Sequence, residues 1–228
     1  MAKKRIKLKD RVLPEYSKGE EIFNMVTHIV GGAIGIATLV FCIIIPALRG
    51  SVAGVLTGIV FGVSMICLYC MSSIYHGLRP NTAKKVFQIM DHCTIYFLIA
   101  GTYTPILVCS MAKKYPVEAW VTFGAIWALT ALATTLTAID LSKYKVFSMI
   151  CYVLLGWAVI FTVKQAFESL GMYGFSLVLA GGLFYTFGIA FFKIGKKKKY
   201  FHSIFHIMTL LGSVCHSCAV IFFVMWNV

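Results

Sequence analysis

The stretch IFNMVTHIVGGAIGIATLVFCIIIPA, residues Ile22–Ala47, decides the fold because it is long and contains no Asp, Glu, Lys or Arg. A helix needs about 20 mostly apolar residues to cross a bilayer, and its backbone hydrogen bonds are satisfied internally there. Six further long and mostly apolar runs follow along the chain: Val52–Tyr75, Val86–Ser110, Val117–Thr137, Val146–Ala166, Met172–Phe192 and Ser203–Trp226. The sequence therefore predicts an all-α integral membrane protein with a bundle of seven transmembrane helices.

The composition supports this fold class. Of the 228 residues, 60% are hydrophobic and 13% are charged, and the mean hydropathy is +0.86. Soluble domains contain about 25% charged residues, so a soluble fold is excluded. We expect residues 21–228 to form one seven-helix transmembrane domain behind a basic cytoplasmic tail, residues 1–20. The polar start of the chain also predicts that there is no cleavable signal peptide.

The charges predict an orientation in the membrane. The 21 Lys and Arg residues outnumber 8 Asp and Glu residues, which gives a formal net charge of +13. In a soluble protein this excess would suggest nucleic acid, but here the cations lie in the tail and the loops. Contact with anionic membrane lipids explains them better, and we expect no nucleic-acid partner. Seventeen of the cations lie on one predicted side and four on the other, so the N-terminus is predicted in the cytoplasm and the C-terminus outside.

Several ionisable side chains interrupt the apolar runs, where they are energetically costly and mark functional sites. Ser72 and His76 are four residues apart at the end of the second run, and His202 and His206 are four apart at the start of the seventh. Residues at this spacing share one face of a helix. Asp91 lies one turn into the third run. The topology predicts that all five meet at the cytoplasmic boundary, with Ser72 about 5 Å deeper.

Three imidazoles with an open position form the ligand set of a catalytic zinc site. A nearby carboxylate can then orient a water molecule or take its proton. Taken singly, each histidine is better explained by hydrogen bonds to lipid headgroups or helix ends. Taken together, the two spaced pairs and the aspartate at matching depth favour a metal.

A second polar stripe opens the first run. Glu21, Asn24 and His28 are spaced on one helix face and start from the same predicted side of the membrane. They either support the metal ligands from behind or anchor and cap the helix, and the spacing fits both. Asp140 and Glu168, near predicted loops, are expected to be solvated.

Four motifs in series resemble those of the hemolysin III family. They are Glu21-x-x-Asn24-x-x-Thr27-His28, SSIYH at Ser72–His76, DHCTIYFLIAGTYTP at Asp91–Pro105 and HSIFH at His202–His206. The resemblance runs from about residue 20 to the C-terminus. That family is the bacterial branch of the progestin and adipoQ receptors, within a superfamily of membrane hydrolases related to alkaline ceramidases.

The resemblance implies a seven-helix fold with a cytoplasmic N-terminus in a bacterial plasma membrane. It implies that zinc is the cofactor and that His76, His202 and His206 hold it. Asp91 would contact the zinc-bound water, and Ser72 would lie close by as a hydrogen-bonding or oxyanion-stabilising group. Eukaryotic relatives are linked to hydrolysis of ceramide-type amides and to receptor signalling, whereas the bacterial name derives from haemolysis.

Three functions follow from these observations. The first is a zinc-dependent hydrolase that acts on a lipid amide or ester within the bilayer. The second is a pore-forming cytolysin, which the family name suggests. The third is a receptor or membrane-state sensor in which zinc is structural.

Overall fold

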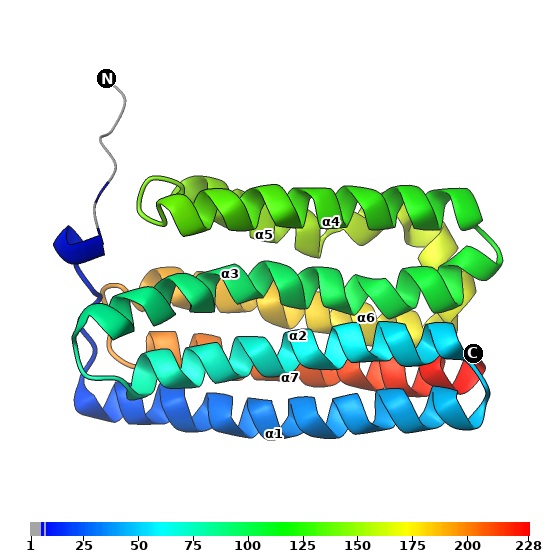
Figure 1. Cartoon of the computed structure of the whole chain (residues 1–228), viewed down its shortest axis with the longest axis horizontal. Helices are drawn as coiled ribbons and strands as arrows, with labels where there is room; N and C mark the ends of the chain where they lie inside the picture. Colours follow the sequence, from blue (N-terminus) through cyan, green and yellow to red (C-terminus); the bar gives the residue numbers. More distant parts are fainter. Residues whose placement is uncertain (1–5, 7) are drawn as a thin grey trace.

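The computed structural model describes residue 6 and residues 8–228, and every secondary-structure element among them is helical. Figure 1 shows the long helices running side by side along the long axis of the molecule. These helices are α1 (Lys18–Leu48), α2 (Val52–Gly77), α3 (Thr82–Pro105), α4 (Pro116–Ile139), α5 (Lys145–Gly156), α6 (Val163–Ile194) and α7 (Phe201–Ala219). Short 3-10 helices are η1 (Leu8–Asp10), η3 (Met111–Lys113), η4 (Ala158–Thr162) and η6 (Met225–Asn227), and π-helical turns are η2 (Ile106–Ser110) and η5 (Val220–Val224).

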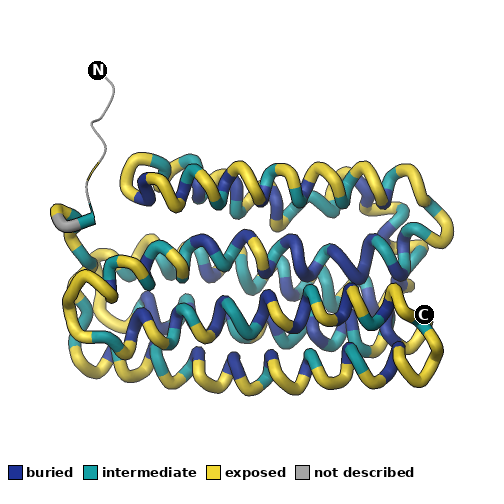
Figure 2. The backbone as a smooth tube through the Cα atoms, viewed as in Figure 1, coloured by how far each residue is buried: buried dark blue, intermediate teal, exposed yellow. Residues whose placement is uncertain are grey.

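Among the described residues, six helical stretches are long and apolar enough to cross a membrane. Their outer surfaces expose large apolar side chains, and Figure 2 shows exposed and buried residues alternating along each helix. An apolar exterior of this kind requires lipid around it. The molecule is therefore an all-helical integral membrane protein that crosses the membrane several times.

The seven-span count stays a prediction. One of the six stretches, Lys145–Ile194, contains 50 residues because α5, η4 and α6 follow one another directly. Within it, Gly171 has φ 68° and ψ 174°, so the backbone is not helical at that residue. The two predicted runs of this region, Val146–Ala166 and Met172–Phe192, lie on either side of Gly171.

Helix α1 begins at Lys18, four residues before the predicted run. Ser17 accepts a hydrogen bond from the backbone N–H of Glu20, and the Glu20 carboxylate accepts one from the backbone N–H of Ser17. This capping box satisfies two N–H groups that a helix start otherwise leaves unpaired. The last residues of the predicted tail are therefore helical, whereas the predicted tail cations Lys3, Lys4, Arg5 and Lys7 lie outside the described residues.

The α4–α5 loop differs from its prediction. Asp140 is only 6% exposed, so the expectation that it is solvated is wrong. Its carboxylate accepts hydrogen bonds from the backbone N–H groups of Ile6, Ser142 and Lys143. Burial raises the pKa of Asp140, but these three donors and the charge of Arg11 outweigh it, so the pKa lies below its ordinary value. Asp140 therefore ties the start of the chain to the bundle.

Candidate metal centre

The three predicted ligands meet at one end of the bundle, here called the histidine end. His76 lies in the last turn of α2, and His202 and His206 lie in the first two turns of α7. One ligand nitrogen from each lies within 4.8 Å of the other two, and all three side chains are buried. The Nε2 atoms of His202 and His206 are 3.0 Å apart, and the Nε2 atom of His76 has no hydrogen-bond partner among the described residues.

This donor set fits a transition metal such as zinc. Buried ring nitrogens without partners are destabilising unless a metal or a proton donor satisfies them. Nitrogen ligands of tetrahedral zinc lie about 3.4 Å apart, given Zn–N bonds of about 2.0–2.1 Å. Small rotations of the three rings would therefore bring them to ligand distances. No fourth His, Cys, Asp or Glu of the described chain joins this group.

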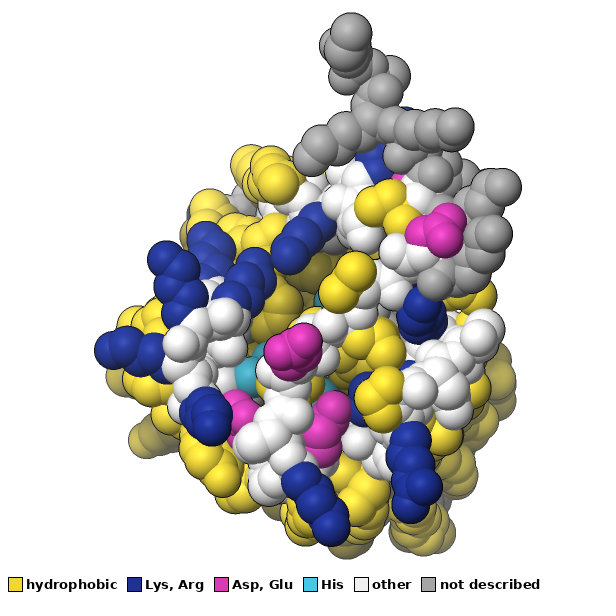
Figure 3. All heavy atoms as spheres, turned by 90° about the vertical axis from the view of Figure 1, so that its left-hand side faces the viewer, with side chains coloured by type: hydrophobic (Ala, Val, Ile, Leu, Met, Phe, Trp, Pro, Cys, Tyr) yellow, Lys and Arg dark blue, Asp and Glu magenta, His cyan; other side chains and the backbone are white. Residues whose placement is uncertain are grey.

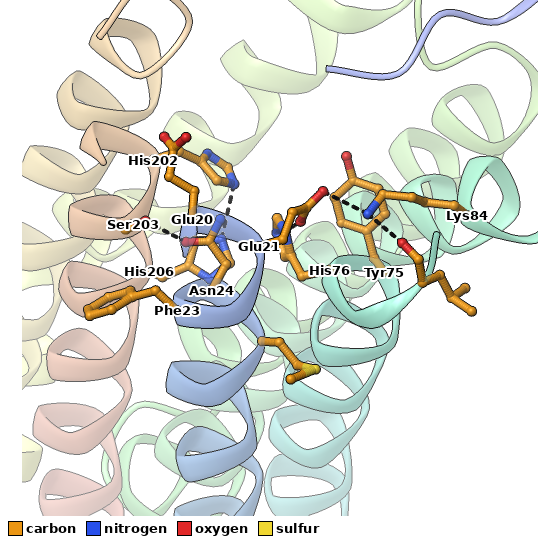
Figure 4. A network of polar contacts seen from close by, with 12 residues as sticks. Glu20, Glu21, Phe23, Asn24, Tyr75, His76, Lys84, His202, Ser203 and His206 are labelled. Carbon is orange, nitrogen blue, oxygen red and sulfur yellow. Dashed lines mark hydrogen bonds and ion pairs between the residues drawn. The ribbon is translucent and has the colours of Figure 1, made fainter. Parts of the chain in front are cut away.

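Glu21 supports His76 from behind. Its Oε2 atom lies 2.6 Å from His76 Nδ1, so the ring donates its Nδ1 proton to the carboxylate and keeps Nε2 unprotonated for a metal. Lys84 Nζ donates to the other oxygen, Oε1, at 2.7 Å and to the Leu78 carbonyl at 2.8 Å. Figure 4 shows Glu21 between His76 and Lys84. Lys84 is only 2% exposed, and its ammonium also lies 5.0 Å from the centre of the Tyr75 ring.

Asn24 and His28 contact α7 instead of His76. Ser203 donates a hydrogen bond to Asn24 Oδ1 at 2.7 Å, which joins α1 to α7 beside the two ligands there. The His28 ring lies 3.9 Å from the His206 ring, and both of its nitrogens are buried without a partner in the described chain. The cap of α1 is formed by Ser17 and Glu20, so the polar stripe does not cap the helix. The structure thus places all three of its residues against the histidine cluster.

Asp91 and Ser72 line a cavity that opens beside the ligands. It has a volume of about 740 Å³, and His28, His202 and His206 also line it. His76 is not among its lining residues. The cavity continues along α7 to His216, ten residues beyond His206, which corresponds to about 15 Å of helix. Its deeper walls are largely apolar, so its size and lining suit a lipid chain.

The N-terminal segment closes part of this end. Residues 11–16 line the same cavity, and the Tyr16 ring stacks on His202 with a centroid distance of 4.8 Å and an interplanar angle of 21°. Burial raises the pKa of Tyr16 well above its ordinary value, and the charge of Glu21 raises it further. Figure 3 looks onto this end, where histidine side chains are visible between acidic and basic groups.

Two contributors to the cluster were not predicted. Tyr16 lies in the segment predicted to be the tail. An aromatic residue among basic residues was the sequence feature that could have indicated its burial. Lys84 was counted among the loop cations, and its neighbours in sequence give no sign that it is buried. Both depend on contacts with segments far away in the chain.

Comparison with known proteins agrees with the four motifs. The model of the family described as "Haemolysin-III related" matches residues 16–217. "Hemolysin-3" of Bacillus cereus is 36% identical over 206 residues, which cover 90% of this chain and 92% of that protein. "Hemolysin-3 homolog" of Bacillus subtilis (strain 168) is 35% identical over 204 residues, which cover 90% of this chain and 94% of that protein.

A more distant relative is the "Monocyte to macrophage differentiation factor" of Homo sapiens. It is 25% identical over 170 residues, which cover 72% of this chain and 69% of that protein. This match supports the relationship to the progestin and adipoQ receptors that the motifs implied. With its long apolar helices, the chain is a multi-pass protein of the cell membrane. On these matches, which cover nearly the whole bundle, the chain belongs to the haemolysin-III related family.

Proposed function

We propose that this protein is a zinc-dependent membrane hydrolase that cleaves a lipid amide or ester at the histidine end of the bundle. One observation carries the proposal: three buried histidine nitrogens within 4.8 Å of one another stand at the end of a largely apolar cavity of about 740 Å³. A metal position with an open coordination site, next to space for a lipid chain, suits hydrolysis within the bilayer.

His76, His202 and His206 would hold the zinc ion. When bound, zinc supplies a Lewis acid and lowers the pKa of water to about 7. Glu21 keeps the Nε2 atom of His76 available through its hydrogen bond to Nδ1. Asp91 and Ser72, which line the cavity, would supply proton transfer and a hydrogen bond to the substrate.

Asp91 is proposed as the general base and Ser72 as a donor to the substrate carbonyl oxygen. Asp91 takes a proton from the attacking water, whose oxygen bonds to the carbonyl carbon. The bond from that carbon to nitrogen or oxygen then breaks, and Asp91 returns the proton to the leaving amine or alcohol. The products are a carboxylic acid and an amine or alcohol, so the reaction consumes one water.

The proposed topology has seven crossings, a cytoplasmic N-terminus and an external C-terminus. A straight helix of 50 residues would be about 75 Å long, and the hydrocarbon core is about 30 Å thick. Lys145 and Lys196, at the two ends of this stretch, line the same cavity. Both facts support a chain that crosses the membrane twice between them, and the break at Gly171 is where it would turn.

Two other functions remain as candidates. The printed names of the Bacillus relatives favour a cytolysin, although the cavity and the histidine cluster give that activity no role. A receptor or membrane-state sensor with structural zinc would have a closed coordination shell. The absence of a fourth ligand from the described His, Cys, Asp and Glu side chains favours a catalytic site.

The proposal is tested with the full chain purified in detergent. Zinc content is measured by mass spectrometry, and release of fatty acid is measured from a ceramide and from a glycerolipid ester. We expect about one zinc per chain and hydrolysis of one of these lipids. His202→Ala and His206→Ala should lose both the metal and the activity.

His216→Ala is the matched control because His216 lies on the same helix but hydrogen-bonds to the Val178 carbonyl at 3.0 Å. It should keep its zinc. If His202→Ala keeps full zinc and full activity, the metal site is assigned wrongly. Full zinc in wild-type protein without hydrolysis would instead favour the sensor, and leakage from liposomes that carry intact protein would favour the cytolysin.

A further inference from the structure

Three basic side chains line the cavity at the histidine end. Arg11 comes from the N-terminal segment, Lys145 is the first residue of α5, and Lys196 follows α6. These positions are far apart in sequence and meet only because of the fold. Figure 3 shows blue Lys and Arg side chains gathered around a hollow at this end. The other cations of the same loops, such as Lys143 and Lys197, do not line the cavity.

Among the described residues, none of these three cations has a carboxylate as an ion-pair partner. The ion pairs of the described residues join Glu21 to His76 and Lys84, Asp91 to His92, and Glu168 to Lys114. None includes Arg11, Lys145 or Lys196. Arg11 interacts electrostatically with Asp140, but the Asp140 carboxylate already accepts hydrogen bonds from three backbone N–H groups.

Lys145 and Lys196 lie close enough to repel each other. Burial lowers the pKa of the Lys196 ammonium, and the nearby charge of Lys145 lowers it further. Two like charges at the edge of an apolar cavity are destabilising unless an anion lies between them. Against these three cations, two carboxylates of the described residues line the cavity: Glu15, which is exposed, and Asp91, which is paired with His92 at 3.9 Å. The cavity edge therefore carries unbalanced positive charge.

We propose that Arg11, Lys145 and Lys196 bind the phosphate head group of a lipid whose acyl chain fills the cavity toward His216. Phosphate suits this set because Arg binds it through two parallel hydrogen bonds and Lys as a point charge. The claim that a phosphate-bearing lipid is the substrate rests on the proposed function. The claim that such a lipid binds here depends on these three residues alone, so binding and hydrolysis are tested separately.

The test measures binding of dioleoyl phosphatidate to the full chain in a neutral detergent by native mass spectrometry. Phosphatidylcholine of the same chains serves as the neutral comparison. The double variant Lys145→Gln/Lys196→Gln is compared with Lys143→Gln/Lys197→Gln, which removes the same charge from the same two loops. We expect the first variant to bind phosphatidate at least about tenfold more weakly and the second to match the wild type, because two charge-assisted contacts are lost only in the first.

Inorganic phosphate distinguishes the two sources of the anion. If the site binds a lipid, millimolar phosphate should displace phosphatidate poorly, since the acyl chain adds buried apolar area. The proposal is overturned if both double variants lose binding equally, if phosphatidylcholine binds as tightly as phosphatidate, or if phosphate alone competes at equal concentration. Zinc content is measured on the same samples. Phosphatidate binding by protein that holds no zinc would contradict the proposed hydrolase and leave the phosphate site standing.

Discussion

At the scale of single residues, the most informative group is the chain of contacts from Lys84 through Glu21 to His76. A buried ammonium is stable only when it is paired and hydrogen-bonded. Lys84 meets this requirement with the Glu21 carboxylate, the Leu78 carbonyl and the Tyr75 ring. Glu21 in turn fixes which nitrogen of His76 carries the proton. Lys84 is therefore linked to His76, a candidate metal ligand, through the carboxylate of Glu21.

This chain predicts that Glu21→Gln weakens zinc binding about 10- to 100-fold, the usual effect of losing a partner that orients a ligand histidine. A neutral amide accepts the His76 proton more weakly and leaves Lys84 without its carboxylate. Zinc affinity is measured by competition with a chelator. Glu118→Gln, in the first turn of α4 and far from the histidine end, is the control and should bind zinc like the wild type.

A second variant separates affinity from stability. Glu21→Gln also leaves the buried Lys84 ammonium without its counter-ion, so the protein should unfold at a lower temperature. Glu21→Gln/Lys84→Met removes the stranded charge and should recover much of the thermal stability while zinc affinity stays low. If affinity recovers along with stability, Glu21 acts on the fold and not on His76.

The sequence predicted the candidate ligands and offered Glu21 as a possible support for them, but it did not predict the parts of Lys84 and Tyr16. The spacing of His202 and His206 places both on one helix face whatever the rest of the fold does. Their meeting with His76 follows from helix order alone. Lys84 lies in the first turn of α3 and Tyr16 lies just before α1, and neither belongs to a periodic pattern that predicts the direction of its side chain.

At the scale of helices, the packing of α1 against α2 depends on glycine. A Cβ atom at Gly58 would lie against the backbone carbonyl of Cys42, closer than real side chains approach. Small residues let membrane helices come together in this way. This contact lies near the start of α2, whereas His76 lies in its last turn, so it concerns the packing of the two helices and not the polar cluster.

We therefore expect Gly58→Ala to destabilise the protein by about 1–3 kcal/mol, the usual range for overpacking. Thermal unfolding in detergent, followed by the fluorescence of a thiol-reactive dye or by circular dichroism, measures this. Gly124→Ala in α4 is the matched control, since a Cβ there meets nothing within 4 Å. Equal unfolding temperatures for the two variants would show that the close contact of α1 and α2 does not limit stability.

At the scale of the whole molecule, hydropathy predicted the fold class because twenty-residue apolar runs have few other solutions. It predicted loops less well. Asp140 was expected in solvent, yet the first residues of the described chain cover it. Residues 11–16, which follow Ile6, line the cavity, so their role follows from a tertiary contact that no local pattern encodes. The start of α1 differs for another reason, since Ser17 and Glu20 form a capping box, a local pattern that a search for apolar runs does not detect.

The last prediction concerns the number of crossings. If residues 145–194 cross twice, reporters fused after Lys143 and after Lys197 lie on the same side, and one fused after Gly171 lies on the other. A single crossing would place the first two on opposite sides. Alkaline phosphatase, active outside the cytoplasm, and green fluorescent protein, fluorescent inside it, measure the side in each case. The excess of cations at the histidine end predicts fluorescence after Lys143 and Lys197, with phosphatase activity after Gly171. Fluorescence after Lys143 and phosphatase activity after Lys197 would contradict seven crossings, and with them the cavity that the neighbouring Lys145 and Lys196 share.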